Sequence, residues 1–183
     1  ATATAGPTAA VRARRVMVTT TAPGDLFPAL ARRVSARTAY HVLTAPVPAT
    51  LRRTLGRRHL LLRHSQEPPH QIAWVDDERV LVGGADSDVV PAGRRSALLI
   101  QRTGQLMYEL STIYPDISGL PPAAGWDQQY AVTETGLPVV GPHRNYPHHL
   151  FAFGTVGASL TGAYLASRLL LRHQRGADDA KDR

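Results

Sequence analysis

The feature that most constrains the fold is a long, nearly uncharged segment close to the C-terminus. Residues 150–171 run for 22 positions with one charge, Arg168, which reaches the length needed to span a bilayer. Gly, Ser and Thr recur along it, however, and these residues insert into a membrane much less favourably than leucine does. The pattern indicates instead a short buried strand at residues 150–153, a turn at Gly154 and a helix over residues 155–173. We therefore expect no membrane span.

A strand that passes through glycine into a helix can also bind a ligand. The first backbone N–H groups of a helix have no partner within it, and they lie at the positive end of the helix dipole. Missing side chains at Gly154 and Gly157 would let an anionic or electron-rich ligand approach the backbone. Close helix packing explains the same glycines equally well, so this Gly-x-x-Gly pattern leaves both interpretations open.

The rest of the chain predicts an α+β fold rather than alternating β-α-β units. The clearest local unit is a hairpin, in which strands at residues 71–75 and 79–83 flank the polar turn at residues 76–78. Apolar residues at helical spacing then predict a helix over residues 96–114. Asp25 is a possible N-cap of a short helix. Further strands are expected at residues 11–20, 38–44, 60–63, 126–132 and 137–141.

The basic composition raises the possibility of a nucleic-acid partner. The net charge is +7, and 20 of the 21 basic residues are arginine, Lys181 being the only lysine. Most of these arginines are scattered, whereas phosphate contacts usually recur along one surface. A solvated helix face explains the one cluster, and we expect no nucleic-acid partner. That cluster consists of Arg52, Arg53, Arg57, Arg58 and Arg63.

Several other classes of chemistry have little support. The chain has no cysteine, which excludes disulfides, a thiolate nucleophile and cysteine metal sites, and fits a reducing cytoplasm. The first residues do not form a signal-peptide pattern, so we expect a cytoplasmic protein. His143, His148 and His149 lie close together in sequence, but Pro147 separates them and no carboxylate is adjacent. We interpret them as loop histidines and expect no metal.

The order of the C-terminal segments resembles that of a known family. Gly136-Leu137-Pro138, followed by residues 150–154 and a helix of small residues, resembles the closing signature of the D-amino-acid oxidase and sarcosine oxidase-like FAD-dependent oxidoreductases. Upstream, residues 16–24 resemble the family's strand ending in an Ala-Thr-Gly turn, and residues 74–84 resemble its Trp-to-Gly-Gly hairpin. No single motif is decisive, but their order covers most of the chain.

The resemblance implies an FAD cofactor and a small-molecule amine or amino-acid substrate. In this family a hydride passes to the flavin from the carbon next to the amine nitrogen, and the dipole of the last helix favours the reduced flavin. The expected cofactor contacts are Ala22, Gly24, Gly154, Thr155, Val156, Gly157, Ser159, Leu160 and Thr161. The expected substrate-pocket residues are Tyr40, Trp126 and Tyr130, and no catalytic residue is identified.

Two departures from the family pattern shape the expected domains. Thr21 stands where the family has glycine, and a β-branched residue disfavours both a positive φ and a close backbone contact. No Gly-x-Gly-x-x-Gly motif follows a strand. We therefore expect a mixed or antiparallel-sheet substrate domain and an incomplete FAD-binding domain that lacks its N-terminal Rossmann β-α-β unit. The expected divisions are an FAD-domain strand and short helix at 1–36, a substrate-binding domain at 37–134, an FAD-domain strand, turn and helix at 135–175, and a disordered tail at 176–183.

Three classes of function follow from these patterns. The first is part of an FAD-dependent oxidoreductase that oxidises a C–N bond, inactive by itself and completed by a missing N-terminal FAD-binding segment. The second is a non-catalytic fragment or remnant of that family. The third is a basic nucleic-acid-binding domain. Flavin bound to the purified full-length product would separate the first class from the other two.

Overall fold

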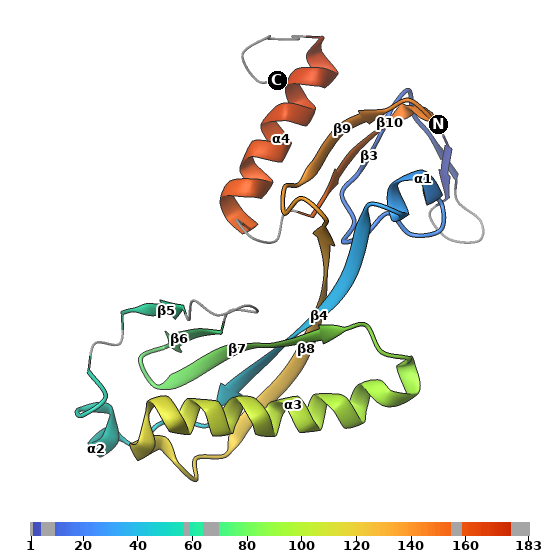
Figure 1. Cartoon of the computed structure of the whole chain (residues 1–183). Helices are drawn as coiled ribbons and strands as arrows, with labels where there is room; N and C mark the ends of the chain where they lie inside the picture. Colours follow the sequence, from blue (N-terminus) through green and yellow to red (C-terminus); the bar gives the residue numbers. More distant parts are fainter. Residues whose placement is uncertain (1, 5–9, 57–58, 64–69, 155–158, 177–183) are drawn as a thin grey trace. The chain divides into compact units, whose positions relative to one another are not determined.

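The chain forms two compact units. The computed structural model describes residues 2–4, 10–56, 59–63, 70–154 and 159–176. Unit 1 consists of Ala1–Ala36 and Tyr130–Arg183, and unit 2 consists of Arg37–Gln129. The boundaries fall within two long strands, β4 (Val34–Thr44) and β8 (Pro122–Thr133), which therefore contribute to both units (Figure 1).

Unit 1 is built on a three-stranded sheet with the order β3-β10-β9. The central strand β10 pairs parallel with β3, with Phe151 opposite Val18, and antiparallel with β9. The buried side chains of Phe27, Phe151 and Phe153 form the centre of its core. The other elements of this unit are a β1–β2 hairpin and two helices. The bounds are β1 (Thr2–Thr4), β2 (Ala10–Arg12), β3 (Val16–Val18), α1 (Pro28–Ala31), β9 (Val139–His143), β10 (Tyr146–Phe153) and α4 (Ser159–Arg175).

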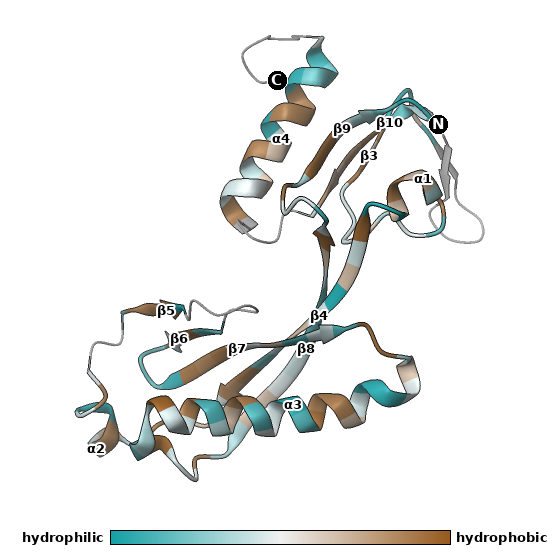
Figure 2. Ribbon diagram, in the orientation of Figure 1, coloured by the Kyte–Doolittle hydropathy of each residue, from teal (hydrophilic) through white to brown (hydrophobic). Residues whose placement is uncertain are grey.

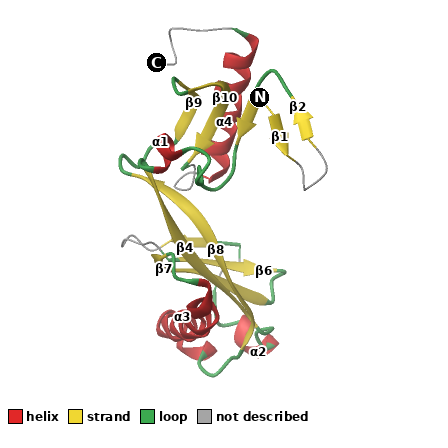
Figure 3. Ribbon diagram, turned by 90° about the vertical axis from the view of Figure 1, so that its right-hand side faces the viewer, coloured by secondary structure: helices red, strands yellow, loops and turns green. Residues whose placement is uncertain are grey.

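Unit 2 is a five-stranded sheet with the order β5-β6-β7-β4-β8 and one long helix, α3, on one face (Figures 1 and 3). Strand β7 pairs antiparallel with both β6 and β4, and β6 pairs antiparallel with β5. The bounds are α2 (Ala49–Arg52), β5 (Leu61–Arg63), β6 (Gln71–Val75), β7 (Arg79–Asp88), α3 (Ala92–Ile113) and the 3₁₀ helix η1 (Pro115–Ile117).

Alternation along the strands decides which face of the unit 2 sheet is packed. Tyr40, Val42 and Thr44 of β4 are buried and share one face, because strand side chains alternate with period two. Leu106 and Leu110 of α3 are one helical turn apart and are buried in the same core. Apolar and polar positions alternate along α3 in Figure 2 accordingly. We call this the core face of the sheet and the opposite side the open face.

Two local irregularities shape strand β7. At its start, the Val75 carbonyl accepts a hydrogen bond from the Glu78 N–H, and both Asp76 and Asp77 have a positive φ, of 53° and 55°. This is the sign pattern of a type I′ hairpin turn, which joins β6 directly to β7. Further along β7, the register with β4 shifts near Ala85, whose φ is 52°. The shift marks a β-bulge.

The sequence located most elements but misjudged two of them. The predicted α+β class, the hairpin and the long helix are present as described above. The strand expected at residues 11–20 is instead two shorter strands, β2 and β3, which pair with different partners. Asp25 does not cap the short helix, whose N-cap is Phe27 and whose first turn contains Pro28. Proline suits that position because the first N–H groups of a helix have no partner within it.

Candidate functional site

The first candidate region is one edge of the unit 1 sheet. Strands β3 and β10 are parallel, so the segments that follow them leave the sheet at the same edge. The segment after β3 contains Ala22 and Gly24, and the segment after β10 begins with Gly154. Ligands of sheets with parallel strands bind preferentially beyond the carboxyl ends of those strands. Two segments that carry expected cofactor contacts and lie far apart in sequence therefore leave the sheet at the same edge.

Gly154 is the most constrained residue at this edge. Its φ is +73°, and a Cβ added there would lie 2.8 Å from Cγ2 of Thr133. A side chain would therefore meet both an unfavourable backbone conformation and a neighbouring strand. Gly24 has a φ of +63° with no atom within 4 Å of an added Cβ, so its glycine is required by the backbone alone.

The remaining expected cofactor contacts lie at the start of the last helix. Thr155, Val156 and Gly157 fall outside the described residues, as does the side chain of Ser159. Leu160 is 85% exposed, and Thr161 is exposed as well. The first turn of α4 is thus uncovered by the described part of unit 1, and its contacts with FAD stay a prediction.

The expected substrate-pocket residues do not share one face of their strands. Tyr40 is 1% exposed in the unit 2 core, and its hydroxyl lies 3.1 Å from Oγ of Ser87. Asp127 of β8 contacts Arg95 of α3, so the side chains of Trp126 and Tyr130 project from the opposite face of β8. Trp126 is 40% exposed. Tyr40 is therefore a core residue, whereas Trp126 is available to a ligand.

His41 is a candidate residue that sequence reasoning missed. It is adjacent to Tyr40 on β4, so its side chain lies on the open face. The imidazole stacks on the Trp126 indole, with ring centroids 5.5 Å apart and planes inclined by 24°. It also lies over Gly83, because a Cβ added there would be 2.7 Å from His41 Nδ1. Glycine at residue 83 is thus what lets the imidazole lie against strand β7.

Charged groups flank this stack. Burial lowers the pKa of His41, and the nearby Asp86 carboxylate raises it by a smaller amount. His41 is therefore mostly neutral at pH 7, with one ring nitrogen available as an acceptor. Arg37 lies on the same face of β4, four residues before His41, and its Nε is buried without a hydrogen-bond partner among the described residues. Buried donors usually have partners, so Arg37 is a second candidate.

The core face carries a different set of polar contacts. His70 Nε2 lies 2.7 Å from Glu109 Oε2, and Gln105 donates a hydrogen bond of 2.8 Å to the other carboxylate oxygen. Arg102 donates to Gln105 and lies over the Tyr40 ring, 5.9 Å from its centroid. These groups link the sheet to one side of α3. Their mutual pairing indicates a structural role.

A bidentate ion pair fixes β8 beside Trp126. Arg95 Nε and Nη2 donate to the two carboxylate oxygens of Asp127 at 2.6 and 2.8 Å. These hydrogen bonds lower the pKa of Asp127. The pair joins α3 to the strand that carries Trp126. Two parallel hydrogen bonds between a guanidinium and a carboxylate fix the relative orientation of the two side chains.

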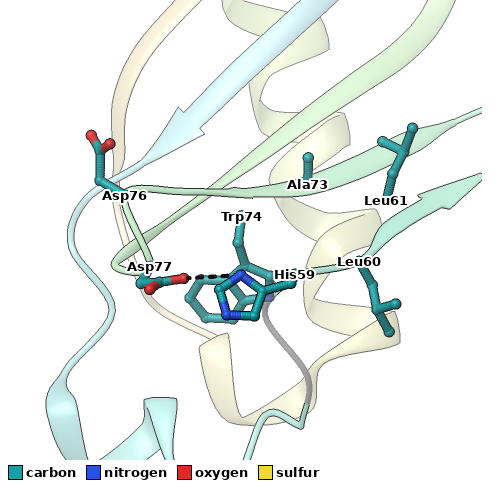
Figure 4. Close-up of a pocket in the computed structure, with 7 residues that line it drawn as sticks. All are labelled: His59, Leu60, Leu61, Ala73, Trp74, Asp76 and Asp77. Carbon is teal, nitrogen blue, oxygen red and sulfur yellow. Dashed lines mark ion pairs between the residues drawn. The ribbon is translucent and has the colours of Figure 1, made fainter.

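A cavity of about 560 Å³ lies at the start of the β6–β7 hairpin (Figure 4). His59 and Asp77, which lie 3.9 Å apart, are 89% and 54% exposed, so this ion pair is solvated and weak. The cavity does not include any expected site residue, and we assign no function to it. Its lining residues are His59, Leu60, Leu61, Ala73, Trp74, Asp76 and Asp77.

Other candidate features can be placed directly. Among the described residues, no cluster of three or more His, Cys, Asp or Glu side chains could hold a metal. His149 stacks on Phe151 in unit 1, and His143 Nδ1 accepts a hydrogen bond from the Asn145 N–H. Within the described part of the chain, no helix is long and apolar enough to cross a bilayer. Of the basic cluster, Arg52 pairs with Glu78 at 2.8 Å, while residues 57 and 58 lie outside the described part.

Comparison with known proteins gives a fold match without a close sequence relative. No protein-family model matches the chain, and no curated protein matches it. Glycine oxidase from Geobacillus kaustophilus matches with a TM-score of 0.67 at 18% identity, over 93% of this chain and 44% of that one. Iminodiacetate oxidase from Chelativorans sp. BNC1 gives a TM-score of 0.68 at 15% identity, over 94% and 45%. L-proline dehydrogenase from P. horikoshii gives 0.56 at 16%, over 84% and 40%.

These matches define the class of fold. The chain has the fold of part of the D-amino-acid oxidase-like flavoenzymes, as the order of its motifs predicted. It spans less than half the length of the glycine oxidase and iminodiacetate oxidase chains. Identities of 15 to 18% establish shared architecture only, and function has to be argued from the site.

Proposed function

We propose that this chain is part of an FAD-dependent oxidoreductase that oxidises the C–N bond of an amine or amino acid by hydride transfer to the flavin. The observation that carries the proposal is the match of nearly the whole chain to glycine oxidase and iminodiacetate oxidase. The β3–β10 pairing supports it, because Ala22 and Gly24 follow β3, Gly154 follows β10, and all three are among the expected cofactor contacts.

The residues at this edge fit one side of a flavin. Gly154, with its positive φ and no room for a side chain, would let a ring system approach the backbone after β10. The first turn of α4, with Leu160 and Thr161, would present unpaired N–H groups and a positive dipole end. When bound, FAD would supply the hydride acceptor, while these residues would orient it and favour its reduced form.

The remaining cofactor contacts would come from elsewhere. The sequence contains no glycine-rich dinucleotide motif, and we propose that an N-terminal FAD-binding segment outside these 183 residues holds the phosphates. The exposed side chains of Leu160, Tyr164 and Leu165 on α4 support a partner surface there, because they form an apolar face. Without that segment the chain would be inactive.

The open face of the unit 2 sheet would serve the substrate. His41, Trp126 and Arg37 lie on this face. We propose that they replace the expected trio, from which Tyr40 drops out because it is buried in the core. Their role would be to hold the substrate carbon and nitrogen in a productive orientation.

The cofactor claim is tested by purifying the full-length product and measuring bound flavin by absorbance after denaturation. We expect about one FAD per chain, and we expect Gly154→Val to reduce the bound amount at least tenfold. Gly119→Val is the matched control, since Gly119 also has a positive φ, of +86°, but lies in unit 2 with no atom within 4 Å. Flavin absent from the wild-type product, or retained equally by both variants, would contradict the proposal.

A further inference from the structure

Three groups on the open face of unit 2 have one chemical property in common. The Trp126 indole is 40% exposed and stacks on the His41 imidazole. Asp86, on β7, lies near enough to His41 to act on its charge. An indole face, a neutral imidazole nitrogen and a carboxylate all attract a positively charged N–H donor. None of the three favours an anion.

The position of the imidazole is fixed rather than accidental. Gly83 lies opposite His41 in the β4–β7 register, and the imidazole occupies the space where a side chain at residue 83 would lie. The indole lies along the other side of the ring, at a centroid distance of 5.5 Å. A ligand therefore meets a preorganised stack, and such a surface loses little conformational entropy on binding.

We propose that His41, Trp126 and Asp86 form a binding site for the ammonium group of an organic amine. The inference rests on the proposed function, which it deepens by naming the charged group through which the substrate is recognised. Binding combines a cation–π contact with Trp126, a hydrogen bond to the neutral His41 ring and attraction to the Asp86 carboxylate.

The other charged groups near the site can be placed on the two faces of the sheet. Arg37 is the cation on the same face of β4, and four strand residues separate its Cα from that of His41 by about 13 Å. His70 and Glu109 lie on the core face and contact each other there. Arg95 is engaged by Asp127.

The chain offers a direct reporter, because Trp74 and Trp126 are its only two tryptophans. Trp74→Phe leaves Trp126 as the single indole, so its emission reports on the proposed site. The probe is n-butylammonium at pH 7.5 and constant ionic strength, with n-butanol as the uncharged isostere. We expect a saturable change in Trp126 emission with the ammonium ion and no saturable change with butanol.

Two variants in the Trp74→Phe background identify the contacts. His41→Phe keeps an aromatic ring on the indole but removes the acceptor nitrogen, and Asp86→Asn removes the charge. Each is expected to weaken binding about tenfold, the effect of losing roughly 1.4 kcal/mol. His59→Phe is the matched control, because His59 is an exposed imidazole of unit 2 at the β5 edge, and its affinity should equal that of the parent.

A pH titration of the Trp74→Phe chain tests the site without any change at His41. Protonated His41 repels the ligand and no longer accepts a hydrogen bond, so affinity should fall as the pH is lowered through the pKa of His41. An affinity that rises as the pH is lowered from 7.5, an equal response to butanol, or unchanged binding by His41→Phe would overturn the inference. Because no flavin is needed, ammonium binding by a full-length product that carries no FAD would refute the proposed function and leave this inference standing.

Discussion

Two histidines of unit 2 occupy equivalent places on opposite faces of the same sheet. An added Cβ at Gly83 would meet His41 at 2.7 Å, and one at Gly84 would meet His70 at 2.6 Å. His70 contacts the Glu109 carboxylate beneath α3, whereas His41 stacks on the exposed indole of Trp126. Consecutive glycines thus admit one imidazole on each face. The surroundings of each ring, and not its residue type, separate a structural histidine from a candidate ligand-binding one.

The largest expected effect on the free energy of unfolding comes from substituting Gly84, the glycine beside the core-face histidine. Gly84→Ala should lower the free energy of unfolding by about 3 kcal/mol, because its φ of +147° is unfavourable for alanine and His70 is held against α3. The measurement is urea denaturation followed by circular dichroism.

Gly83→Ala is the matched variant for this comparison. Gly83 has no positive φ, so only the contact with the His41 ring on the open face opposes the added Cβ, and the expected loss is about 1 kcal/mol. Equal losses for the two variants would show that the faces do not differ in the way described.

The core-face ion pair should give the next largest effect. Glu109→Ala removes the partner of His70 and one hydrogen bond from Gln105. It should cost about 1 kcal/mol, since the side chains of His70 and Glu109 are both partly exposed to solvent. Glu134→Ala provides the control, because Glu134 is exposed. A Glu109 variant as stable as the control would remove the structural role assigned to His70.

A substitution on α3 that is expected to stabilise the fold tests whether the core face and the open face are independent. Gly104 lies within α3, and nothing is within 4 Å of an added Cβ. Gly104→Ala should raise the unfolding free energy by about 0.5–1 kcal/mol through helix propensity alone. Thermal unfolding would detect it as a higher Tm, and ammonium binding on the open face should be unaffected. Altered binding would mean that the two faces are coupled.

The smallest expected effect is the pH dependence due to His41. Burial lowers its pKa in the folded state, so the unfolded chain takes up the proton first as pH falls. The stability that His41 contributes is complete above about pH 6.5, its unfolded value, and is lost as pH falls toward the folded pKa. The wild type should therefore lose a few tenths of a kcal/mol more than His41→Gln between pH 7.5 and 5.5, the effect being reduced by solvent screening. A difference of the opposite sign would contradict the assignment.

Local patterns in the sequence were sufficient to predict most of the helices and strands. The hairpin at β6 and β7 follows from two apolar strands around a turn of acidic residues, and α3 follows from apolar residues at helical spacing. The strand at residues 11–20 was misjudged because its breakdown into β2 and β3 depends on separate partners, far apart in the chain. Tertiary pairing of that kind leaves no local signal.

The candidate site was predictable only in part. Gly154 and Trp126 stand in motifs of the resembling family, whereas His41 does not. Its role depends on the pairing of β4 with β7, which sets Gly83 opposite it, and on the neighbouring strand β8. Tyr40 illustrates the same limit, since a one-residue difference along β4 decides between the core face and the open face.

We propose above that this chain is part of a protein that oxidises a C–N bond with a flavin. The most direct measurement mixes the purified full-length product with a primary amine or an amino acid in the absence of oxygen and follows the flavin absorption band. We predict that the band bleaches in a single turnover, and that His41→Phe raises the substrate concentration needed for half-maximal bleaching. A product that binds FAD but whose absorption is unchanged across a panel of amines and amino acids, while chemical reduction still bleaches it, would contradict the account.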